Sequence, residues 1–137
     1  MRVVVNSLEE MRTVACNFAD KLGVGDVVLL NGDLGAGKTT FTQFAFAHLG
    51  VKEVVNSPTF SILKTYEGKC ILHHFDTYRI STEEAVEAGF DEILDDRNSI
   101  IFIEWSEKIE PLIPLRHIIV NIRFINENTR EIEIINE

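Results

Sequence analysis

The chain has 137 residues, of which 45% are hydrophobic and 26% charged, and this composition predicts one globular domain spanning residues 1–137. Acidic residues outnumber basic ones by 22 to 13, and the formal net charge of -9 argues against stable direct binding to nucleic acid, because carboxylates repel phosphate backbones. No apolar stretch approaches the ~20 residues of a membrane span, and the N-terminus lacks the pattern of a signal peptide, so we expect a cytoplasmic protein.

Hydrophobic periodicity and capping residues predict alternating strands and helices in the first half of the chain. A strand at 2–6 precedes a helix that Ser7 caps and that runs to about residue 22. A continuous apolar strand at 26–31 then leads through a glycine-rich loop into a helix at 38–49.

The second half is predicted to add a hairpin, two short helical segments, a strand buried on both faces and a half-buried terminal hairpin. These elements correspond to residues 59–67 with 69–77, 81–89, 91–95, 99–104, and 120–124 with 130–135. Together the elements predict an α/β fold of the P-loop nucleoside triphosphate hydrolase type. It is a sandwich on a mixed, mainly parallel central sheet that carries a C-terminal antiparallel hairpin.

The loop after the strand at 26–31 fits a phosphate-binding pattern without a departure. Its sequence is Gly32-Asp33-Leu34-Gly35-Ala36-Gly37-Lys38-Thr39, which matches G-x-x-x-x-G-K-S/T, and Thr40 follows. Backbone N–H groups of such a loop converge on phosphate oxygens, and the N-terminus of the following helix adds a partial positive charge. We therefore predict a nucleoside triphosphate site in which Lys38 contacts phosphates and Thr39 ligates Mg²⁺.

A nucleotide-bound Mg²⁺ needs a second contact, usually an acid that ends a buried strand beside the P-loop strand. Glu104 ends the apolar run at 99–104 and fits this place, and Trp105 follows it directly. Asp76 ends another predicted strand and is a candidate to ligate Mg²⁺ or orient water. Arg79, nearby, is a candidate for a phosphate contact or for a structural ion pair.

Two further segments contain residues with reactive or ligating chemistry. His73 and His74 are adjacent on a predicted strand and point to opposite faces, so a zinc site formed by this pair alone is not expected. Ser57 and Thr59 lie in a Ser-Pro-Thr-Phe turn after the P-loop helix, where hydrolases often have a loop that senses the γ-phosphate.

Four motifs in order resemble the TsaE family, the small bacterial P-loop ATPases required for threonylcarbamoyladenosine (t⁶A) formation at adenosine 37 of tRNAs that decode ANN codons. They are G-D-L-G-A-G-K-T-T at 32–40, S-P-T-F at 57–60, H-F-D-T-Y-R at 74–79 and I-E-W at 103–105. The resemblance is specific over residues 32–105, and the segments outside them match in pattern only.

The resemblance implies roles for individual residues. Lys38 and Thr39 are expected at the phosphates and Mg²⁺, Glu104 at Mg²⁺, and Asp76 as a catalytically required acid. Further expectations are a switch-like loop at 57–60, Trp105 beside the site, and an adenine pocket that uses Ser7, Leu8 and Arg130.

The resemblance also implies the cofactors and partners. ATP and Mg²⁺ are the expected ligands, and the expected partners are the TsaD transferase subunit and its TsaB partner, on whose complex the family's ATP hydrolysis acts. Stable direct binding to tRNA is not expected. The negative surface charge agrees with docking on a protein.

Three other functions are compatible with a P-loop. A small-molecule or nucleotide kinase usually needs a lid rich in arginine, whereas the arginines after the P-loop are dispersed. A GTPase would use an N-K-x-D segment, and no Asn in the chain is followed by Lys. An ATP-sensing module with little turnover stays open, because a sequence reveals ligands and not rates.

Overall fold

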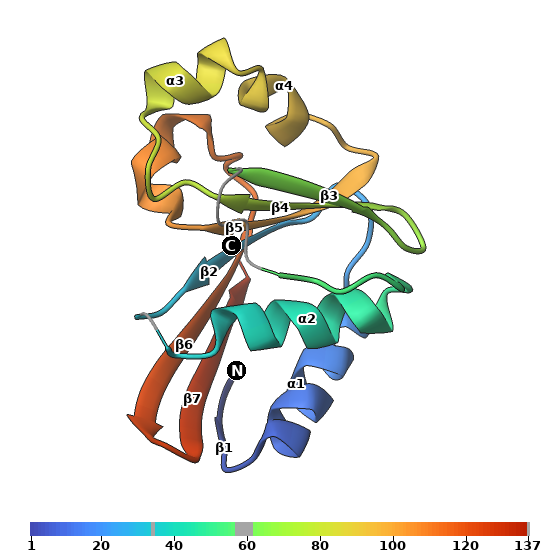
Figure 1. The fold of residues 1–137 in the computed structure, drawn as a ribbon, viewed down its shortest axis with the longest axis vertical. Helices are drawn as coiled ribbons and strands as arrows, with labels where there is room; N and C mark the ends of the chain where they lie inside the picture. The colour runs from blue at the N-terminus through green and yellow to red at the C-terminus, as the bar shows by residue number, and fades with distance from the viewer. Residues whose placement is uncertain (34, 57–61, 137) are drawn as a thin grey trace.

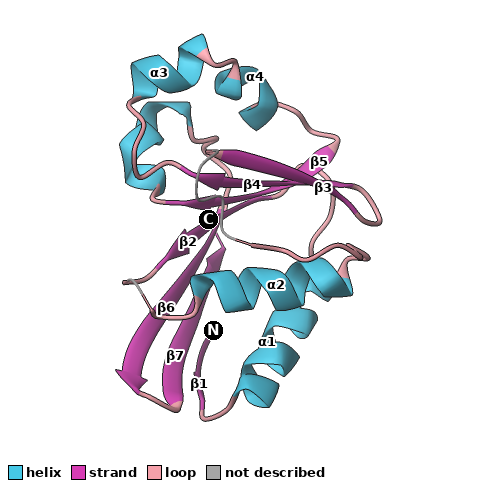
Figure 2. Ribbon diagram, viewed as in Figure 1, coloured by secondary structure: helices cyan, strands magenta, loops and turns pink. Residues whose placement is uncertain are grey.

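The computed structural model describes residues 1–33, 35–56 and 62–136, and within them seven strands form one mixed sheet. The strand order across the sheet is β1-β7-β6-β2-β5-β4-β3, and helices lie on both faces (Figure 1). Strands and helices alternate along much of the chain, as Figure 2 shows. The elements are β1 (Arg2–Val5), α1 (Leu8–Asp20), β2 (Val27–Asn31), α2 (Lys38–His48), β3 (Leu63–Glu67), β4 (Ile71–Asp76), α3 (Thr82–Glu87), α4 (Phe90–Leu94), β5 (Ser99–Glu104), the 3₁₀ helix η1 (Ser106–Leu112), β6 (Ile118–Asn126) and β7 (Thr129–Asn136).

The four central strands β6, β2, β5 and β4 are parallel, and β3, β7 and β1 join them in antiparallel pairs. The predicted α/β fold, with a parallel centre and a C-terminal antiparallel hairpin, is confirmed. Strand β6 has a second role that its sequence pattern did not reveal, because it also pairs in parallel with the P-loop strand β2. The carboxyl ends of all four parallel strands therefore meet at one edge of the sheet. At this edge Glu104 is the register partner of both Leu30 and Asp76.

Two apolar cores, one on each face, explain why β2 and β5 are continuous hydrophobic runs. Val28, Leu30 and Phe102 pack in the core beneath α1 and α2. Their chain neighbours Leu29 and Ile103 pack in the core beneath α3, α4 and η1. Successive side chains of a strand point to opposite faces, so a strand covered on both sides needs apolar residues at every position.

The predicted helix starts are confirmed by their caps. Ser7 Oγ accepts a hydrogen bond from Glu10 N at 3.1 Å at the start of α1. Ser81 and Glu84 form a complete capping box at the start of α3. In the described part of the chain, no helix is long and apolar enough to cross a bilayer.

Candidate functional site

The loop between β2 and α2 is shaped by its glycines. Gly37 has φ 110°, a conformation that favours glycine, and it caps α2 just before Lys38. Gly32 lies against the backbone of β6, where an added Cβ would be 2.6 Å from Ile122 O. The loop then turns through a hydrogen bond from Ala36 N to Asp33 O at 2.9 Å. These constraints place the start of α2 at the carboxyl edge of the parallel strands.

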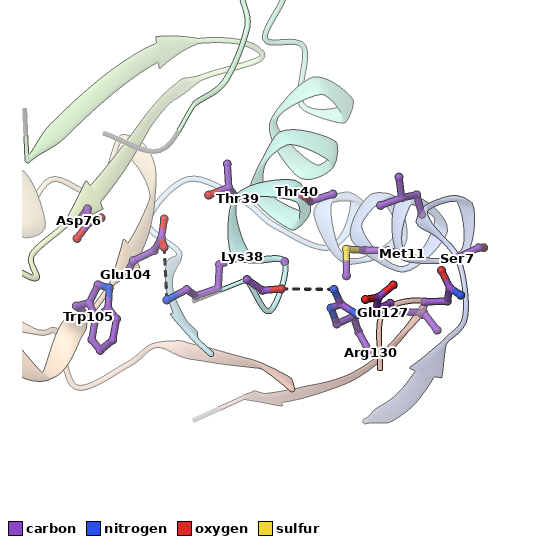
Figure 3. Close-up of a pocket in the computed structure, with 15 residues that line it drawn as sticks. Ser7, Met11, Lys38, Thr39, Thr40, Asp76, Glu104, Trp105, Glu127 and Arg130 are labelled. Atoms are coloured by element: carbon purple, nitrogen blue, oxygen red, sulfur yellow. Dashed lines mark hydrogen bonds and ion pairs between the residues drawn. The ribbon is translucent and has the colours of Figure 1, made fainter. Parts of the chain in front are cut away.

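A pocket of about 470 Å³ lies at this edge, in the range of small-molecule sites. Its walls come from the loop, the start of α1, the ends of β4 and β5, and the turn between β6 and β7 (Figure 3). The lining residues are Val5, Ser7, Leu8, Met11, Gly35, Gly37, Lys38, Thr39, Thr40, Asp76, Glu104, Trp105, Glu127, Asn128 and Arg130.

Lys38 and Glu104 form the charged centre of the pocket. Lys38 Nζ lies 3.7 Å from Glu104 Oε1 and 4.6 Å from the centroid of the Trp105 ring (Figure 3). Both charged side chains are buried, and Glu104 also pairs with His74, whose Nε2 lies 2.7 Å from Glu104 Oε2. A buried carboxylate between two such partners is held in one place, because each partner compensates part of its desolvation.

The backbone bends sharply where β5 ends. Trp105 has φ 61°, the one positive φ of a non-glycine residue among the described positions. Thr77, which is fully buried, holds this bend: its one hydroxyl hydrogen is shared between Trp105 O at 2.6 Å and Glu104 O at 3.1 Å. The bend puts the Trp105 ring beside Tyr78, with centroids 4.9 Å apart. Backbone strain of this kind is often found at functional sites.

Arg130 braces the loop from the other side. Its Nε donates to Ala36 O at 3.0 Å, its Nη1 donates to Asn126 O at 2.6 Å, and the guanidinium stacks 4.5 Å from the Phe124 ring. The side chain thus ties the loop between β2 and α2 to the β6–β7 hairpin while it lines the pocket (Figure 3).

The pocket brings together most of the predicted site residues. Ser7, Leu8, Thr39, Thr40 and Arg130 line it along with the predicted catalytic residues and Trp105. Ala36, within the loop, is fully buried, and Asp33 and Arg79 are exposed; none of the three is among the lining residues. The predictions for Leu34, Ser57 and Thr59, and the switch at 57–60, lie outside the described residues.

Several residues of the site were not assigned to it by the sequence analysis, among them the apolar lining residues Val5 and Met11. Glu127 and Asn128 line the pocket from the β6–β7 turn, and His74 contacts Glu104 from inside the core. His73 faces the other side of β4, where its Nδ1 lies 2.9 Å from Thr65 Oγ1, so the two histidines point apart as predicted. The sequence held one signal for His74. It lies two positions before Asp76, and residues two positions apart on a strand point to the same face of the sheet.

Burial raises the pKa of the Asp76 carboxyl, and the hydrogen bond that its Oδ1 accepts from Tyr78 N at 3.1 Å offsets part of this rise. The folded protein therefore holds this proton more tightly than the unfolded chain does. Asp76 favours folding below its ordinary pKa of 3.8, and this contribution is lost as the pH rises through the higher pKa of the folded state.

Asp76→Asn is expected to remove this loss, because the amide carries no charge. The variant should have about the same Tm as the parent near pH 3.5 and a higher Tm at about pH 7, as thermal unfolding at both pH values would measure. Asp95→Asn, at an exposed position, is the control. A variant that is no more stable than the parent at neutral pH would contradict the assigned cost of burying Asp76.

Comparison with known proteins identifies the family. A family model described as "Threonylcarbamoyl adenosine biosynthesis protein TsaE" matches residues 5–132. A protein of Rickettsia felis, named tRNA threonylcarbamoyladenosine biosynthesis protein TsaE, is 42% identical over 97% of this chain and 78% of its own length. The Bacillus subtilis protein of the same name is 39% identical over 90% of this chain and 78% of its own length.

A solved structure agrees with these relatives. The crystal structure of Bacillus subtilis YdiB matches with a TM-score of 0.81 and 33% identity, covering 96% of this chain and 82% of that one. The fold is thus the P-loop type found in that protein. On these grounds the chain belongs to the TsaE family and has a role in the biosynthesis of tRNA threonylcarbamoyladenosine.

Proposed function

We propose that this protein binds ATP with Mg²⁺ and hydrolyses it in support of t⁶A formation, acting on a complex of a TsaD-like transferase subunit and a TsaB-like partner. One observation carries the proposal: the P-loop after β2 and the acid that ends β5 meet in one pocket, with Lys38 Nζ 3.7 Å from Glu104 Oε1. A lysine from the loop after one parallel strand and a carboxylate at the end of the neighbouring strand are the pair that P-loop hydrolases use for phosphate and metal.

The residues present fit these ligands. Gly32 and Gly37 let the backbone turn where a Cβ would meet Ile122 O or the Met11 side chain, and in loops of this kind backbone N–H groups converge on phosphates. Thr39 and Glu104 offer the hydroxyl and carboxylate oxygens that Mg²⁺ prefers. The bound ion would neutralise charge that develops on the phosphate oxygens.

Lys38 has a second task in this proposal. Phosphate oxygens compete with Glu104 for its ammonium group, so nucleotide binding draws Lys38 away from Glu104 Oε1 and leaves that oxygen free for another cation. Asp76, whose carboxyl lines the same pocket, is placed to accept a proton or orient water.

Nucleotide addition is expected to change the fluorescence of Trp105, the only tryptophan in the chain. Its ring is in contact with Lys38, which would change partners, and with Tyr78. The measurement is a fluorescence titration with ATP and Mg²⁺, alongside calorimetry that reports binding independently. A flat titration in the presence of calorimetric binding would argue against the change of partners by Lys38.

Exposed apolar residues at the rim of the pocket support a protein partner that covers it. Leu8, which lines the pocket, is 67% exposed, and Tyr78, which packs on Trp105, is 55% exposed. The two side chains come from different sides of the pocket (Figure 3), and exposed large apolar side chains around a polar site favour an interaction surface. A partner docked there would exclude water from the pocket and strengthen its electrostatic interactions.

The proposal is tested by steady-state ATPase assays with and without the TsaD–TsaB pair, together with t⁶A formation by the reconstituted set. The chain alone should turn over at or below ~1 s⁻¹, and excess partner pair should accelerate it. Fast hydrolysis by the chain alone would favour an independent ATPase, and phosphate transfer to a small molecule would favour a kinase. Binding without turnover, even with the partners, would favour an ATP sensor. Unchanged t⁶A formation when the chain is omitted would refute the proposed role.

A further inference from the structure

The carboxylate of Glu104 has a different partner at each oxygen. Oε1 lies 3.7 Å from Lys38 Nζ at the pocket, and Oε2 lies 2.7 Å from His74 Nε2 in the core. We propose that His74 is a positioning residue that fixes Glu104 through Oε2 and keeps Oε1 available for charge in the pocket. This inference rests on the proposed function, because it concerns how Glu104 serves the same site.

The His74 ring is itself held in place. It is fully buried on the α2 side of the sheet, where it packs edge-on against Phe46 with centroids 6.2 Å apart and an interplanar angle of 74°. The β4–β5 register pairs His74 with Phe102 and Asp76 with Glu104, so the imidazole reaches along the sheet from one residue pair to the next. Packing on this scale leaves the ring little freedom to turn.

The hydrogen-bond pattern determines which group donates. His74 Nδ1 has no hydrogen-bond partner among the described residues. A neutral ring with hydrogen on Nε2 donates to the Glu104 carboxylate and leaves only a lone pair unpaired, whereas hydrogen on Nδ1 would leave a buried N–H without an acceptor. The first arrangement costs less, so the imidazole is the donor and the carboxylate the acceptor.

The consequence concerns the geometry of the site. Glu104 is 3% exposed, so water cannot replace a lost partner at Oε2, and without His74 both oxygens would compete for Lys38. A carboxylate that can rotate is a poorer ligand for a small, geometrically demanding ion such as Mg²⁺. Loss of a hydrogen-bond partner behind a metal ligand typically lowers metal affinity or activity about 10- to 100-fold.

Variants at position 74 separate this role from simple filling of the core. His74→Leu removes the donor, His74→Gln places an amide N–H near the former Nε2, and His74→Asn places one near the former Nδ1, too far from Glu104. His73→Leu is the matched control, because it makes the same change one residue away on the opposite face, where His73 contacts Thr65.

The main measurement is the Mg²⁺ concentration needed for half-maximal binding of a non-hydrolysable ATP analogue, read by calorimetry. We expect about a 10- to 100-fold increase for His74→Leu and His74→Asn, and much less for His74→Gln and His73→Leu. When a chelator removes Mg²⁺, every variant should bind the ATP analogue with an affinity close to that of the parent. The Gln and Asn variants preserve this comparison if the Leu variant does not fold.

Two further readouts separate this proposal from the proposed function. In the ligand-free parent, nitrogen-detected NMR of the imidazole should report hydrogen on Nε2 of His74 and none on Nδ1, and the opposite tautomer would overturn the proposal. Steady-state hydrolysis with the TsaD–TsaB pair should fall in His74→Leu and recover in His74→Gln. If the parent is active and His74→Leu matches it in Mg²⁺ dependence, the positioning role alone is refuted. If the parent binds no nucleotide, the proposed function fails and the positioning role fails with it.

Discussion

Lys38→Ala is expected to weaken ATP binding by about 10- to 100-fold and to abolish measurable turnover with the partner pair. Charged hydrogen bonds to a ligand contribute about 1.5–3 kcal/mol each, and the lysine is the cationic side chain of the phosphate-binding loop. Calorimetric titration with ATP and the coupled ATPase assay measure the two effects. Thermal unfolding of the variant reports separately on the loss of the buried contact with Glu104.

A second lysine provides the control for this variant. Lys108 also lies over an aromatic ring, with its Nζ 5.5 Å from the centroid of Tyr78, but it is exposed and does not line the pocket. Lys108→Ala should bind and hydrolyse ATP like the parent. If Lys38→Ala did the same, the P-loop would not be the nucleotide site.

Glu104→Gln should reduce hydrolysis by about 100- to 1000-fold while changing ATP affinity in chelator much less, because a group that stabilises developing charge acts mainly on the transition state. The amide oxygen can still accept the hydrogen bond from His74 Nε2, which keeps the side chain in place, while an uncharged NH2 group replaces the carboxylate oxygen that faces Lys38. Single-turnover hydrolysis and equilibrium binding, measured over a range of Mg²⁺ concentrations, separate the two effects.

An acid three residues further along the chain serves as the control. Glu107 lies in η1, close to Glu104 in sequence, but it is exposed and outside the pocket. Glu107→Gln should therefore leave both rate and affinity unchanged. Parental hydrolysis by Glu104→Gln would remove Glu104 from the mechanism and leave Asp76 as the acid to test next.

Local patterns in the sequence predicted much of the fold. The apolar run at 99–104 indicated a strand covered on both faces, and β5 is buried at every position. The capping pairs of Ser7 and Ser81 predicted where two helices begin. These signals work because the side-chain periods of strands and helices, and the hydrogen bonds of a helix cap, involve residues only a few positions apart.

The sequence by itself also determined which residues line the centre of the pocket. The P-loop pattern, Asp76 and Glu104 were read from motifs at strand ends, and parallel strands place such ends at one edge of a sheet. The tertiary structure decided the rest. Arg130 hydrogen-bonds to Ala36, 94 positions away, because β7 lies beside β6 and β6 beside β2. His74 meets Glu104 because of the β4–β5 register. Contacts of this kind depend on which strands become neighbours, and that order follows from packing of the whole chain rather than from any local pattern.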